Sequence, residues 1–139
     1  MPQLRKDPVI GRWVIIATER SKRPSAYIAD HEKPKGGFCP FCENQEHHTP
    51  PEVLAYRNGD SERDGAGWWV RVVPNKFPAL EIEGPLNRRG EGMYDCMSGV
   101  GAHEVVIETP DHNASLADHD PRQVQEILWA FRDRVIELK

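Results

Sequence analysis

The chain has 139 residues, of which 38% are hydrophobic and 29% charged, and its formal net charge is −4. This length and composition fit one soluble domain with a modest core. The negative charge argues against a dedicated nucleic-acid binder, because such proteins neutralise phosphates with basic side chains. The longest apolar run, residues 13–17, is too short for a membrane-spanning helix, and the N-terminus lacks a signal-peptide core. Three cysteines, two of them in a C-x-x-C pair, suit a reducing cytoplasm better than a disulfide scaffold.

The first predicted element is a strand at residues 12–17 (RWVIIA), which is short, apolar and rich in β-branched side chains. Residues 18–67 follow, mostly Pro, Gly and charged residues with no sustained period. A connection of that length is unusual in a compact domain unless something ties it down. A metal bound by the C-x-x-C pair within it would do so.

Two further strands are predicted from alternation. In residues 68–73 (WWVRVV) the even-numbered side chains should share one face and the odd-numbered ones the other. In residues 103–109 (HEVVIET) the odd-numbered side chains form the apolar face, and two glutamates flanking a valine form the wetter one. This pattern is typical of an antiparallel sheet that is covered on one side only.

The last predicted element is a helix over residues 121–139. Asp120 suits the N-cap, Pro121 the first turn, and Gln123 a capping-box spacing. The apolar positions then follow the helical period: Val124, Ile127, Leu128, Phe131, Val135 and Leu138. No stop signal precedes Lys139, so we expect the natural protein to continue.

Together these elements predict an α+β fold. We expect a mostly antiparallel sheet that includes the strands near 12–17, 69–73 and 103–109, with the C-terminal amphipathic helix packed on one face. An exposed sheet edge should pair with something, and a second copy of the chain would make a homodimer.

The C-x-x-C pair, Cys39 and Cys42, has the spacing that lets two thiolates bind one tetrahedral ion. Two other interpretations stay open, namely a thioredoxin-like redox pair and two unliganded loop cysteines. The redox pair needs a strand before it and a helix after it, and the loop-like flanks supply neither. Candidates for the remaining ligands are His31, His47, His48, Cys96, His103, His112 and His119. Of these, His112 directly follows a predicted strand, in a Pro-Asp turn that could aim its ring at the loop.

Four segments in order resemble the galactose-1-phosphate uridylyltransferases, a family of the histidine triad superfamily. These are RKDPVIGRWVIIATERSKRP, FCPFC, WWVRVVPNKFPAL and GAHEVVIETPDH. The resemblance covers nearly the whole chain but only the N-terminal part of a family member. It implies that residues 1–139 are the N-terminal, histidine-triad-like half of such a protein, ending before the catalytic His-x-His-x-Gln motif, which the 139 residues do not contain.

The resemblance implies zinc held by Cys39, Cys42 and His112, with a fourth histidine just upstream of the catalytic motif. It also implies a ping-pong reaction in the cytoplasm. A histidine attacks UDP-glucose, expels glucose 1-phosphate and passes the uridylyl group to galactose 1-phosphate. The nucleophile is not among these residues, so the chain alone should be inactive.

Substrate contacts are implied for six residues. Arg20 and Arg23 of ERSKRP would bind phosphate, although charged turns are most often only solvated. Asn75 would read a base or ribose edge, or else form a local turn. The remaining three are Phe41, Lys76 and Val105.

Two alternatives remain. ADP-glucose phosphorylases of the same family share the motifs LRKDPV and HEVVIETP, bind adenine and accept inorganic phosphate. A non-enzymatic zinc-stapled binding module, complete at 139 residues, would need a fourth ligand such as His31 or His47 within the chain.

Overall fold

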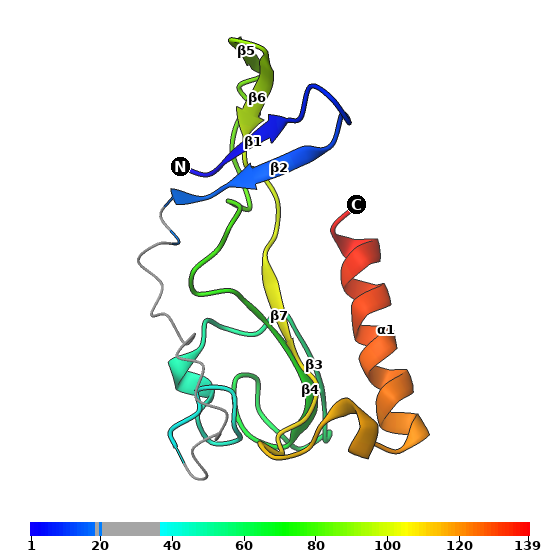
Figure 1. Cartoon of the computed structure of the whole chain (residues 1–139). Helices are drawn as coiled ribbons and strands as arrows, with labels where there is room; N and C mark the ends of the chain where they lie inside the picture. The colour runs from blue at the N-terminus through cyan, green and yellow to red at the C-terminus, as the bar shows by residue number, and fades with distance from the viewer. Residues whose placement is uncertain (19, 21–36) are drawn as a thin grey trace. The chain divides into compact units, whose positions relative to one another are not determined.

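The computed structural model describes residues 1–18, 20 and 37–139, and the chain divides into two compact units. The first unit consists of Met1–Glu32 and Phe77–His103, and the second of Lys33–Lys76 and Glu104–Lys139. Each unit is built on an antiparallel sheet, and the second also carries the single α-helix of the described residues (Figure 1). The α+β fold predicted from the sequence is therefore confirmed. None of the helices described is both long and apolar enough to cross a membrane.

The sheet of the first unit has four strands in the order β2-β1-β6-β5. Their bounds are β1 Gln3–Lys6, β2 Trp13–Ile16, β5 Arg89–Glu91 and β6 Tyr94–Ser98. The turn between β1 and β2 is fixed by Asp7, whose carboxylate accepts the backbone N–H groups of Val9 (2.8 Å) and Ile10 (3.2 Å). Gly11 closes the turn at φ +71°, a conformation that favours glycine. Residues 3–16 therefore form a hairpin.

The expectation that the 12–17 strand shares a sheet with 69–73 and 103–109 is wrong. β2 pairs with β1 and lies at the edge of the first sheet, whereas the other two strands belong to the second unit. The physical reason is the tight turn at Asp7, which brings β1 against β2 with little loss of chain entropy. Periodicity identifies a strand but does not identify its partner.

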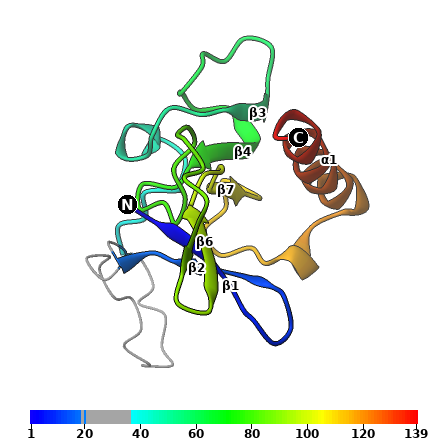
Figure 2. The same ribbon diagram turned by 90° about the horizontal axis from the view of Figure 1, so that it is seen from above.

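The sheet of the second unit has three strands in the order β3-β4-β7. They are β3 Leu54–Arg57, β4 Trp68–Pro74 and β7 Glu104–Ile107, and helix α1 spans Pro121–Glu137. Figures 1 and 2 both show α1 beside this sheet. The core between them consists of Val70 and Val72 on β4 and Ile127 and Ala130 on α1.

Helix α1 begins where the sequence predicts, but of the predicted apolar positions only Ile127 belongs to the buried core cluster. The Asp120 carboxylate caps it by accepting the backbone N–H of Gln123 at 2.8 Å. The Gln123 side chain does not complete a capping box. It donates instead to the carbonyls of Trp69 (2.9 Å) and Glu108 (2.6 Å), joining the helix to β4 and the end of β7. The small Ala130 lets the helix approach the sheet, and the larger apolar side chains predicted to pack there are exposed. These are Leu128, Phe131, Val135 and Leu138.

A β-bulge at the start of β4 changes which side chains share a face. Arg57 of β3 is opposite Trp68 and Tyr56 is opposite Val70, so Trp69 has no partner in the register. Trp68 therefore packs with Val73 on the face away from α1, while Trp69 packs on the helix side. The predicted strict alternation is thus wrong for the two tryptophans.

The predicted wetter face of the 103–109 strand is the face that α1 covers. Val106 packs against the helix-side core. The carboxylate of Glu104 is half of a bidentate pair with Arg134 of α1, at 2.7 and 2.8 Å. Because the helix supplies a cation, a glutamate can lie on a covered face, and the alternation of charge therefore misidentified the solvent side.

The opposite face of β4 carries a buried charge cluster. Arg71, whose side chain is 1% exposed, donates to Glu52 (2.8 Å), Thr49 (2.9 Å) and Asp64 (3.1 Å). Glu52 is also buried and is paired with Arg57 of β3. The loops on either side of β3 are thus fastened to the centre of β4 by ion pairs.

Replacing Arg71 by Met should lower the free energy of unfolding by about 3 kcal/mol, because Glu52 and Asp64 lose a buried cationic partner. Arg132→Met is the matched control, since Arg132 forms an ion pair with Asp133 at the surface and should cost less than about 1 kcal/mol. Urea denaturation at neutral pH measures both values. An equal loss of unfolding free energy in the two variants would contradict the conclusion that Arg71 is a buried partner of Glu52 and Asp64.

Tyr56 should make the stability of the second unit depend on alkaline pH. Burial, and then the 2.8 Å hydrogen bond to Asp133, raise the pKa of Tyr56 from 10.0 to about 12. The proton is held more tightly in the folded state, so this contribution is complete below pH 10 and is lost as pH rises through about 12. Tyr56→Phe should cost about 1 kcal/mol at neutral pH. The difference in free energy of unfolding between this variant and wild type should become smaller as pH rises from 10 to about 12. A difference that stays constant over this range would contradict the prediction.

Candidate metal centre

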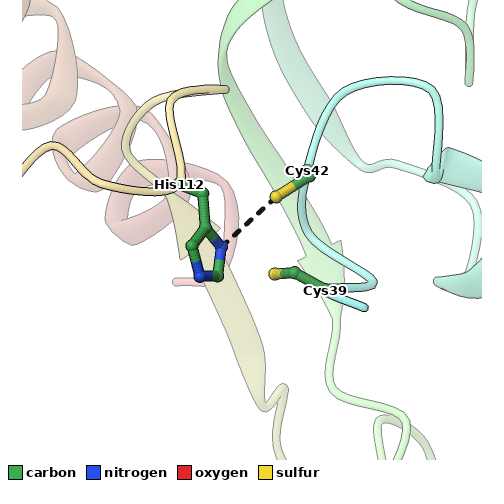
Figure 3. Close-up of side chains that lie close together, drawn as sticks. All are labelled: Cys39, Cys42 and His112. Carbon is green, nitrogen blue, oxygen red and sulfur yellow. Dashed lines mark hydrogen bonds between the residues drawn. The ribbon is translucent and has the colours of Figure 1, made fainter. Parts of the chain in front are cut away.

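Three side chains from two distant parts of the sequence meet in the second unit. The thiols of Cys39 and Cys42 and the ring of His112 offer donor atoms that all lie within 4.8 Å of one another. Figure 3 shows the three groups pointing toward one another, with Cys42 Sγ 3.4 Å from His112 Nδ1. A tetrahedral zinc ion spaces a sulfur and a nitrogen ligand about 3.5 Å apart. The group could therefore bind a metal ion.

The cysteine half of the group is shaped by successive tight turns. The N–H of Cys42 donates to the carbonyl of Cys39 (3.3 Å), and the N–H of Gln45 donates to the carbonyl of Cys42 (3.1 Å). Asn44 adopts φ +66°, which asparagine tolerates better than most residues. The chain then enters a short 3-10 helix, Glu46–His48. These turns place both sulfurs on the same side of the loop.

The histidine half is shaped by the turn that follows β7. The N–H of Asp111 donates to the hydroxyl of Thr109 (3.1 Å), and the Asp111 carboxylate accepts the N–H of Asn113 (2.9 Å). These local bonds turn the chain sharply around His112. The turn expected from the sequence at Pro110–Asp111 is therefore present.

The electrostatics around Cys42 favour a protonated thiol. Burial raises the pKa of Cys42, and so do the hydrogen bond with Cys39 and the negative charges of Cys39 and Asp111. A metal ion needs the thiolate, so its binding must release a proton from this site. The donor set, two soft sulfurs and one imidazole, is the type that zinc prefers.

The other candidate ligands do not join this group within the residues that the structure describes. The rings of His47 and His48 contact each other at 4.0 Å, and His48 also contacts Phe38 edge-on at 4.7 Å. His103 accepts the backbone N–H of Ala79 at 2.9 Å, as a core histidine does. His31 lies outside the described residues. Cys96 is buried in the first unit.

The six predicted substrate contacts are distributed over both units. Arg20 belongs to the first, where it lines a cavity of about 430 Å³ with Ile15, Ala17 and Ala79. Arg23 lies outside the described residues.

The other four belong to the second unit. Phe41 is 40% exposed between the two cysteines. Val105 packs beside Trp68 on the face of the sheet away from α1. Asn75 and Lys76 follow directly after β4.

Sequence reasoning missed the residues that support the site, above all Glu46 and Glu52. Glu46 is 6% exposed and accepts the indole N–H of Trp68 at 2.8 Å, whereas Glu52 binds Arg71. One signal was available in the sequence. An arginine in the middle of an apolar strand, as in WWVRVV, needs a buried carboxylate partner.

The sequence of residues 1–139 matches the protein-family model described as galactose-1-phosphate uridyl transferase, N-terminal domain. The chain belongs to this family. It is 36% identical to an ADP-glucose phosphorylase of Arabidopsis thaliana, over 99% of this chain and 39% of that protein. It is 25% identical to a galactose-1-phosphate uridylyltransferase of Thermotoga maritima, over 99% of this chain and 36% of that protein.

Among solved structures, the chain is similar to an ADP-glucose phosphorylase from Arabidopsis thaliana with bound ADP-glucose. The TM-score is 0.53 at 34% identity, over 99% of this chain and 38% of that one. The chain thus spans about two fifths of the length of the relatives it matches.

Replacing Cys39 by Ser should abolish stoichiometric metal binding and increase proteolytic cleavage between residues 37 and 67, because the loop loses its attachment to His112. The matched control is Cys96→Ala, which removes the remaining thiol from the first unit and should leave metal content unchanged. Elemental analysis and limited proteolysis measure the two effects. Equal metal content in the Cys39 variant and wild type would contradict the assignment.

Proposed function

We propose that the full-length protein is a nucleotidyltransferase that acts on a nucleotide sugar and a sugar phosphate. The observation that carries this proposal is the family match over residues 1–139. The reaction proceeds through a histidine intermediate. A new N–P bond forms as the P–O bond to the departing hexose 1-phosphate breaks, and the acceptor then takes the nucleotidyl group. We assign the nucleophile to a His-x-His-x-Gln motif outside the 139 residues, so the isolated chain should not turn over.

The metal in this proposal is zinc, held by Cys39, Cys42 and His112 together with a fourth histidine from outside these 139 residues. The grouping of the three donor atoms within 4.8 Å, with Cys42 Sγ 3.4 Å from His112 Nδ1, supports this choice. The ion supplies structural cross-linking here. It connects the loop that carries Phe41 to the chain leaving β7.

Two donor nucleotides fit the proposal. UDP-glucose with galactose 1-phosphate as acceptor is the reaction predicted from the sequence. The greater identity to an ADP-glucose phosphorylase, 36% against 25% for a uridylyltransferase, favours ADP-glucose with inorganic phosphate. We therefore place the adenylyl reaction first and keep the uridylyl reaction as the second candidate.

The proposed substrate contacts are those that the family resemblance implies, and the chemistry of the side chains suits these roles. Guanidinium groups bind phosphate oxygens in a bidentate manner, which suits Arg20 and Arg23. The amide of Asn75 can hydrogen-bond a base or ribose, and the exposed ring of Phe41 can contact a base. Lys76 and Val105 complete the proposed set, and a homodimer is the proposed assembly.

The test uses full-length protein in two assays, ADP-glucose with inorganic phosphate and UDP-glucose with galactose 1-phosphate. Turnover in the first alone assigns the phosphorylase reaction, and turnover in the second alone assigns the uridylyl transfer. Absence of turnover in both assays, with folded and metal-loaded protein, would refute the nucleotidyltransferase proposal.

In the active assay, Arg20→Ala should weaken substrate binding by about 1.5–3 kcal/mol through loss of a charge-assisted hydrogen bond. The surface control Arg132→Ala should have almost no effect. An Arg20 variant that binds like wild type would show that this side chain is only solvated.

A further inference from the structure

Glu46 is buried and follows the cysteine pair closely in the sequence, without belonging to the metal group. It lies on the 3-10 helix that follows Cys42, and it accepts the indole N–H of Trp68 (2.8 Å) and the backbone N–H of Asn44 (3.2 Å). A buried carboxylate is costly unless such bonds hold it. These two hydrogen bonds therefore fix the position of the Glu46 carboxylate.

Glu46 and Cys42 are parts of one continuous series of turns. The N–H of Gln45 binds the carbonyl of Cys42, so the residue before Glu46 is hydrogen-bonded to the metal ligand itself. The neighbouring Glu43 adds a second attachment, because its carboxylate accepts the N–H of Gly67 at 2.8 Å. Both glutamates thus fasten the cysteine loop to the start of β4.

The histidine half of the site is located by the same strand. β7 pairs with β4, Ile107 being opposite Arg71, and the antiparallel direction carries the following residues toward the start of β4. The amide of Gln123 then binds the carbonyls of Trp69 and Glu108 together. Both the cysteine loop and the turn that carries His112 are therefore attached to the start of β4.

We propose that Glu46 is a positioning residue for the metal centre. Through its bond to Trp68 it holds the Cys39–Cys42 pair at the separation from His112 that a single ion requires. The proposal rests on the proposed metal site. Its consequence is that loss of the Glu46–Trp68 bond weakens metal binding even in protein that remains folded.

Two adjacent tryptophans provide a matched test. Trp68 donates to Glu46 on the face away from α1, and Trp69 donates to Glu126 on the helix. Trp68→Phe and Trp69→Phe each remove one indole N–H bond to a glutamate, and both should lower the melting temperature. Trp68→Phe should reduce zinc affinity about tenfold, as losses around metal ligands do, whereas Trp69→Phe should leave it unchanged.

Two substitutions at Glu46 separate position from charge. Glu46→Asp keeps the charge but withdraws the carboxylate by one methylene, and it should weaken zinc binding as Trp68→Phe does. Glu46→Gln keeps an oxygen acceptor in place, so this variant should retain most of the wild-type zinc affinity. If Trp68→Phe does not fold, this pair still tests the proposal.

Zinc affinity is measured on the full-length protein by competition with a chromophoric chelator. The thiolate absorption of the cobalt-substituted protein reports the geometry of the cysteine pair. Equal affinities for the two tryptophan variants, or for the Asp and Gln variants, would overturn the proposal. A wild-type protein that binds neither zinc nor cobalt would instead refute the proposed metal site.

Discussion

The guanidinium of Arg71 is buried at the centre of β4, the middle strand of the sheet in the second unit. Removing such a group from water costs several kcal/mol unless oxygen acceptors surround it. Glu52, Thr49 and Asp64 supply these acceptors. All three come from the segment between the cysteine loop and β4, so these bonds fasten the loops on both sides of β3 to this face of β4.

The strand β4 therefore has two faces that are stabilised in different ways. On the helix side, Val70 and Val72 pack against Ile127 and Ala130, where burial of apolar area dominates. On the other side, Arg71 and Trp68 bind the carboxylates of the loops. The bulge decides which tryptophan lies on which face, because the extra residue places Trp68 on the side of Val73 and Trp69 on the side of Val70. Each indole then donates to a glutamate on its own side. The cysteine loop of the metal group is held to β4 by hydrogen bonds, through Glu43 and Glu46, and not by apolar packing against α1.

The features that sequence predicts well here are those set by local chemistry. The cap at Asp120 and the helix beyond it follow from neighbouring residues, and the spacing of Cys39 and Cys42 follows from ligand geometry. The allocation of strands to two sheets was not predictable, because alternation says nothing of partners. The bulge was not predicted, because a single extra residue in one strand changes neither the composition of that strand nor its apolar character. The predicted helix face was right for Ile127 and wrong for the large side chains that are exposed, because Ala130 packs by virtue of its small size, which a count of large apolar positions ignores.

The sequence separation of the metal donors indicates how the proposed zinc would contribute to stability. An ion bound by Cys39 and Cys42 alone closes a loop too short to restrict the rest of the unfolded chain. His112 is 70 residues from Cys42, and a cross-link over that distance removes about 4 kcal/mol of chain entropy from the unfolded state if it behaves like a disulfide. The intervening residues include β3, β4 and β7. The cysteine pair thus captures the ion, while His112 determines how much of the second unit the ion stabilises.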